Sequence, residues 1–68
     1  MDALGPGDSD PVIEVCAKKL GVVPATEEFS ELLAQRIRGL QSLNGLELTG
    51  VLDEEVLKIL KVGDGDEG

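Results

Sequence analysis

The sequence predicts a compact, all-α domain of three helices, with a short extended segment between the second and third helices. Three stretches carry apolar residues at the spacing of an amphipathic helix, and each begins at a residue type that caps helices. Between the second and third stretches, apolar residues alternate with others as they do in a strand. We expect a flexible N-terminal arm at residues 1–9, the helical domain at residues 10–62 and an acidic, glycine-rich tail at residues 63–68.

The first predicted helix covers about residues 11–20. Asp10 is expected to be its N-cap, and Pro11 fits the first helical position because an N–H there would have no partner. Gly21 is a suitable residue to end the helix. The expected buried face comprises Ile13, Cys16, Ala17 and Leu20.

The second predicted helix begins after Thr26, which is expected to be its N-cap. Glu27 and Glu28 then lie in the first turn, where the helix dipole favours negative charge. The pair Asn44-Gly45 is a strong stop signal. The expected buried stripe comprises Phe29, Leu32, Leu33, Ile37 and Leu40.

The third predicted helix begins at Asp53, again an N-cap followed by two glutamates, and Gly63 follows its end. In the extended segment before it, residues 46–52, Gly50 allows a tight bend. Leu46, Leu48 and Leu52 are expected to pack beneath the helices. A partly buried loop needs partners for its backbone groups, and the Gln41 side chain, one turn before the stop, is placed to supply one.

These patterns resemble the peptidoglycan-binding domain family, a three-helix fold often attached to wall hydrolases. The best match is the run Leu40-Gln41-Ser42-Leu43-Asn44-Gly45-Leu46-Glu47-Leu48-Thr49-Gly50-Val51-Leu52-Asp53. The resemblance covers about residues 5–60 and departs from the family pattern at Ala17, Arg36, Val56 and Leu57. The predicted core comprises Ile13, Cys16, Leu20, Phe29, Leu33, Ile37, Leu40, Leu48, Val56 and Leu60.

The composition excludes several classes of partner. Acidic residues number 14 against six basic ones, for a net charge of -8, so duplex nucleic acid and anionic membranes would repel the chain. Phe29 is the only aromatic residue, which removes the stacking surfaces that bind sugars and single-stranded nucleic acid. No apolar run is long enough to span a membrane. We therefore expect no nucleic-acid and no membrane partner.

The residue types also argue against an enzyme. The chain has no histidine and no nucleophile beside a base. Cys16 fits a small, buried apolar position. The adjacent glutamates at residues 27–28 and 54–55 do not face each other on a helix, and the aspartates at both ends lack the ligand spacing of a calcium loop. We expect no catalysis, no metal and no cofactor.

The resemblance implies a site for wall peptides in a shallow groove beside the loop that follows the second helix. The polar residues there are Asn44, Glu47 and Thr49. The same residues also have a structural interpretation, as a helix stop, an exposed position on the extended segment and a turn residue.

Two functions of different class remain open. The sequence narrowly favours a small structural or decorating protein of a larger assembly, such as an accessory subunit of a bacteriophage particle. Such a chain would contact like subunits or another protein and lie in the virion, or in the host cytoplasm before assembly. Its small size, its start Met without a secretory signal and its negative charge favour this hypothesis. The alternative, favoured by the family pattern, is a module that binds peptidoglycan in the cell wall.

Overall fold

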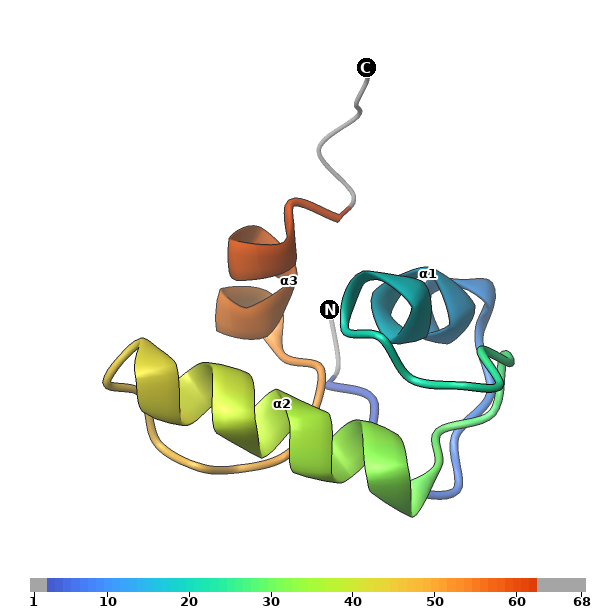
Figure 1. Cartoon of the computed structure of the whole chain (residues 1–68), viewed down its shortest axis with the longest axis horizontal. Helices are drawn as coiled ribbons and strands as arrows, with labels where there is room; N and C mark the ends of the chain where they lie inside the picture. The colour runs from blue at the N-terminus through green and yellow to red at the C-terminus, as the bar shows by residue number, and fades with distance from the viewer. Residues whose placement is uncertain (1–2, 63–68) are drawn as a thin grey trace.

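Three helices make up the regular structure of the domain. The computed structural model describes residues 3–62, and the helices are α1 (Pro11–Lys19), α2 (Glu31–Leu43) and α3 (Glu54–Leu60). Helix α2 runs along one side of the molecule, with α1 and α3 packed above it (Figure 1). Residues 3–62 form no strand, so the predicted all-α, three-helix fold is confirmed. The predicted tail at residues 63–68 lies outside the described residues.

Local capping chemistry sets the start of α1 and α3. The Asp10 carboxylate accepts a hydrogen bond from the Val12 N–H at 2.9 Å, and the Asp53 carboxylate accepts one from the Val56 N–H at 3.0 Å. Both caps were predicted from the sequence and are confirmed. Gly21 follows α1 with a φ of +75°, a left-handed conformation that glycine adopts without a steric penalty.

Helix α2 begins later than predicted. Its N-cap is Ser30, whose hydroxyl accepts a hydrogen bond from the Leu33 N–H at 3.2 Å, so the assignment of Thr26 as N-cap was wrong. The Thr26 hydroxyl instead accepts a long bond, 3.3 Å, from the Glu28 N–H. The stretch before Ser30 cannot be helical because its backbone pairs elsewhere: the Phe29 N–H donates to the Asp8 carbonyl at 3.0 Å. Phe29 is therefore buried as an extended residue and not as part of a helical stripe.

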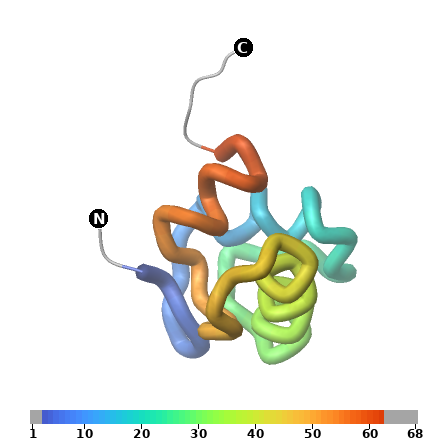
Figure 2. The backbone as a smooth tube through the Cα atoms, turned by 90° about the vertical axis from the view of Figure 1, so that its left-hand side faces the viewer, coloured from blue at the N-terminus to red at the C-terminus, as the bar shows by residue number. Residues whose placement is uncertain are grey.

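Residues 3–9, expected as a flexible arm, are attached to the domain by two isolated antiparallel bridges. Leu4 pairs with Leu52, through hydrogen bonds of 3.2 and 2.8 Å, and Ser9 pairs with Glu28. Figure 2 shows this N-terminal segment running beside the chain that enters α3. The bridges close the underside of the core, where Leu52 is fully buried.

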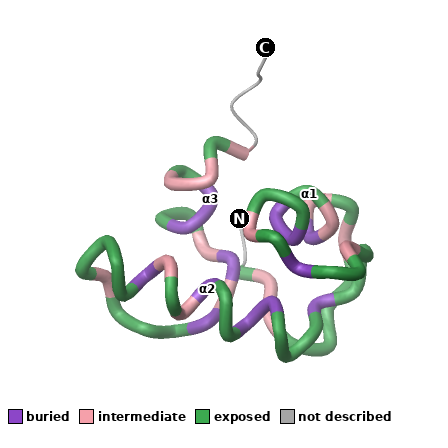
Figure 3. Tube along the Cα trace, viewed as in Figure 1, coloured by how far each residue is buried: buried purple, intermediate pink, exposed green. Residues whose placement is uncertain are grey.

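The core lies between the three helices (Figure 3). Its buried apolar residues are Ile13, Cys16, Ala17, Val22, Phe29, Leu33, Ala34, Ile37, Leu52, Val56 and Leu57. Three predicted core residues, Leu20, Leu40 and Leu60, are partly buried at its edge.

Two leucines predicted to be buried are exposed. Leu48 is 54% exposed, because the Thr49 N–H donates to the Glu47 carbonyl at 3.0 Å and this tight bend replaces the regular strand that would have turned Leu48 inward. Leu32 is 40% exposed, because it lies beside the face of α2 that enters the core. The prediction of burial was therefore wrong for both residues.

Candidate functional site

The only thiol is buried and unreactive. Cys16 has no exposed surface, and desolvation by burial raises the pKa of its thiol, with a smaller opposing effect from the positive charge of Lys19. A protonated, inaccessible thiol cannot act as a nucleophile at neutral pH. Within residues 3–62, no group of three or more acidic or cysteine side chains gathers as a metal site would require.

The polar residues predicted to bind a ligand are mostly engaged within the loop after α2. The Asn44 amide donates to the Leu40 carbonyl at 2.8 Å, which makes it part of the helix end. The Thr49 hydroxyl accepts from the Gln41 amide at 2.8 Å. Glu47 is exposed, and its carboxylate makes no hydrogen bond or ion pair with the described residues. Of the three side chains, only Glu47 makes no hydrogen bond with the described residues.

Gln41 holds this loop against α2, as the sequence predicted. Its side chain is 1% exposed and its carbonyl oxygen accepts from the Gly50 N–H at 3.0 Å, while the Gln41 backbone carbonyl accepts from the Leu46 N–H at 2.8 Å. The loop therefore obtains its backbone partners from one buried amide side chain and one helix-end carbonyl. Its shape is fixed without a strand.

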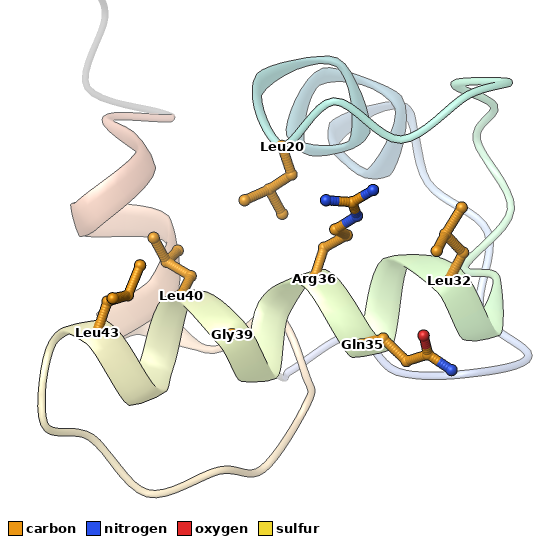
Figure 4. Close-up of a pocket in the computed structure, with 7 residues that line it drawn as sticks. All are labelled: Leu20, Leu32, Gln35, Arg36, Gly39, Leu40 and Leu43. Carbon is orange, nitrogen blue, oxygen red and sulfur yellow. The ribbon is translucent and has the colours of Figure 1, made fainter.

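A groove that the sequence did not predict lies between α2 and the C-terminal end of α1. Its volume is about 630 Å³, and Figure 4 shows Arg36, Leu40 and Leu43 projecting from α2 on the side where Leu20 lies. Its lining residues are Leu20, Leu32, Gln35, Arg36, Gly39, Leu40 and Leu43. The signal that could have revealed it is a second apolar stripe on α2: Leu32, Leu40 and Leu43 recur at helical spacing beside the buried face.

The groove carries positive charge in a chain that is otherwise strongly acidic. Arg36 lies in it, and no carboxylate in residues 3–62 comes within ion-pair distance of its guanidinium. Arg38, two residues along the same helix, is instead paired with Glu31 at 3.5 Å. Lys18 and Lys19 end α1 directly before Leu20. The groove therefore combines apolar side chains with one guanidinium that makes no ion pair within the described residues.

A smaller hollow of about 260 Å³ lies where the N-terminal segment meets the chain before α2. It is lined by Gly7, Asp8, Ser9, Glu28 and Phe29. The Asp8 carboxylate accepts from the Gly5 N–H at 2.8 Å, and the surrounding backbone groups form the bridge between Ser9 and Glu28. These contacts serve the fold, and we assign no ligand to this hollow.

No helix in residues 3–62 combines the length and apolar character needed to cross a bilayer. Residues 18–60, more than half of the chain, match the family model described as "Putative peptidoglycan binding domain". The matched segment includes all of α2, the loop held by Gln41 and all of α3. No curated protein and no solved structure matches the chain.

Proposed function

The chain belongs to the peptidoglycan-binding domain family, and we propose that it is a non-catalytic module that attaches to peptidoglycan in the cell wall. The observation that carries the proposal is the family match over residues 18–60, which spans most of the packed domain. The family is a binding family and not a catalytic one, and the buried, protonated Cys16 thiol agrees with that assignment. The proposal concerns this domain alone.

The surface chemistry limits how such a domain can bind the wall. Peptidoglycan consists of glycan strands linked by short peptides. The chain has no aromatic residue except Phe29, whose ring is buried, so stacking on a sugar ring is not available. Contacts with the peptides, through apolar and charged groups, fit this surface better.

The net charge of -8 opposes the approach to an anionic wall, but salt screens this repulsion over about 8 Å at physiological ionic strength. Binding must therefore come from local contacts. Glu47 is the member of the predicted polar trio whose side chain makes no hydrogen bond with the described residues, and its carboxylate can accept hydrogen bonds from N–H groups of the wall peptides. The loop around Glu47 is one proposed location of the contact.

Sedimentation with purified sacculi tests the proposed function. We expect the chain to pellet with sacculi in a saturable manner and to remain bound at moderate salt. The matched control omits the sacculi, and a second control replaces the chain by an unrelated protein of similar size and negative charge. A chain that stays in the supernatant, or that pellets without saturation, would contradict wall binding.

The hypothesis of a structural or decorating role in a particle such as a bacteriophage rests on size and charge. The family match gives it no support. It has its own test, since a structural subunit is recovered with purified particles in a fixed ratio to their other proteins. Recovery with particles in a fixed ratio, combined with no binding to sacculi, would favour the virion subunit over the wall-binding module.

A further inference from the structure

We propose that the groove between α1 and α2 binds the short peptides of peptidoglycan, with Arg36 pairing a free peptide carboxylate and the leucines covering aliphatic side chains. The proposal rests on the proposed function, because peptidoglycan supplies the ligand. This contact surface is separate from the loop around Glu47 and shares no residue with the predicted trio Asn44, Glu47 and Thr49.

The apolar surface of the groove is the first reason. A surface helix normally buries one stripe and presents polar residues on the rest of its circumference. Helix α2 buries Leu33 and Ile37 and also exposes Leu32 and Leu43, which are 40% and 87% accessible. The volume of about 630 Å³ lies within the range of small-ligand sites, about 300–1,000 Å³.

The charge of the groove is the second reason, and it selects the ligand. Arg36 points from α2 into the space between Leu20 and Leu32 (Figure 4). Its planar guanidinium can hold a carboxylate through two parallel hydrogen bonds. The apolar walls exclude water from one side of such a pair, which strengthens it relative to a fully solvated pair. An anionic ligand with aliphatic groups is therefore complementary to the groove.

Gly39 is the third reason. It lies in α2 within the groove, although glycine is among the least favourable residues in a helix interior. A Cβ added at Gly39 would meet no atom within 4 Å, so neither packing nor backbone geometry requires glycine there. What glycine does provide is a bare backbone on the groove floor, where a ligand can approach closely.

These features favour a wall peptide over two other occupants. A glycan strand would need aromatic or dense polar contacts, and the groove offers neither. A second copy of the chain would bring another charge of -8 towards the first, and the repulsion opposes close association. A short peptide is complementary to both parts of the groove, because its alanine-like side chains can pack on the leucines and its carboxylate can pair with Arg36.

The test compares Arg36→Met with Arg38→Met. Both variants remove one cation from α2 and change the net charge from -8 to -9, but only Arg36 lines the groove. The probes are intact sacculi, the peptides that an amidase releases from them, and the peptide-free glycan strands that remain. We expect Arg36→Met to weaken peptide binding, measured by calorimetry, at least tenfold, or about 1.4 kcal/mol. Arg38→Met should bind as the wild type does, and thermal unfolding checks that both variants fold.

Further outcomes separate this proposal from the proposed function. If the wild type pellets with sacculi and Arg36→Met pellets equally well, the groove assignment is wrong while wall binding stands. If free glycan strands compete and free peptides do not, the ligand assignment is wrong. If the wild type does not pellet but binds free peptides through Arg36, the groove stands and attachment to the wall fails. A wild-type dimer that Arg36→Met dissociates would assign the groove to a second copy and overturn the proposal.

Discussion

Replacing Gly39 by alanine should stabilise the domain and weaken the binding of its proposed peptide ligand. In a helix interior alanine is about 1 kcal/mol more favourable than glycine. No steric clash reduces this stabilisation, because the new Cβ would meet no atom within 4 Å. For a domain of this size, 1 kcal/mol corresponds to an increase in Tm of about 4–8 °C. The same methyl group would lie on the groove floor and crowd a bound peptide. Overpacking by a group of this size costs at least about 1 kcal/mol of binding free energy, which raises the Kd about fivefold.

Urea unfolding and peptide calorimetry on the same preparations measure the two effects. Stability should rise at unchanged m-value, which shows that the unfolded and folded states keep their compactness. The affinity for the peptide should fall. Ser42→Ala, on the same helix and away from the groove, is the control for helix propensity. A Gly39→Ala variant that is less stable would show that the floor is not open, and one that is more stable with unchanged affinity would show that no ligand contacts it.

Two further predictions concern the core and the loop. Gln41→Met should lower the free energy of unfolding by about 1–3 kcal/mol, because the buried Gly50 N–H loses its acceptor, whereas Gln35→Met on the exposed side of α2 should change little; urea titrations compare the two variants. Cys16 should resist thiol reagents in the folded chain and react at the rate of unfolding, as mass spectrometry of labelled protein would detect. Burial raises the pKa of the Cys16 thiol above its ordinary value of 9.0, so the unfolded chain loses the thiol proton at lower pH than the folded chain does. The stability that the protonated thiol contributes is therefore complete below pH 9.0 and declines as the pH rises above it. Cys16→Ala should remove this part of the pH dependence, and an identical alkaline decline in Cys16→Ala would refute the assignment.

The elements that the sequence predicted correctly depend on local chemistry. Asp10 and Asp53 cap α1 and α3 because a carboxylate two or three residues before a free N–H needs nothing distant to form the bond. Gln41 was recognised because a partly buried loop must satisfy its backbone groups, and one amide stood a turn before it. These predictions needed only near neighbours in the chain.

The start of α2 was predicted incorrectly because two caps compete. Thr26 followed by Glu27 and Glu28 and Ser30 followed by Glu31 are comparable local signals. The choice is made by backbone pairing with residues 8–10, which hold the chain before Ser30 in an extended form. Pairing of segments about 20 residues apart leaves no mark in the local pattern.

The groove was missed for a different reason. Leu32 and Leu40 fit a helical stripe, and a stripe is normally assigned to the core, so both leucines were placed there. Periodicity shows that residues share a face but does not show which face another element covers. Helix α2 carries two adjacent apolar faces: Leu33 and Ile37 are buried in the core, whereas Leu32 and Leu43 are exposed and Leu40 is only partly buried. The distinction required the positions of the other helices.

Each feature of the second face has an ordinary explanation when taken alone. Single exposed leucines are normal on protein surfaces, unpaired arginines are common, and a helix can tolerate one glycine. Their position on one face of a short domain is harder to explain in that way. Burying a leucine stabilises a fold by about 1.5–3 kcal/mol and a helical glycine costs about 1 kcal/mol, so a domain shaped by stability alone would fill or repair this face. Leu43 is 87% exposed, so its side chain contributes almost no burial to the stability of the fold. Within the described residues, Arg36 makes no ion pair, and no neighbouring atom requires a glycine at position 39. A bound ligand accounts for all three with one contact surface, which is why the comparison of Arg36→Met with Arg38→Met is decisive for this face.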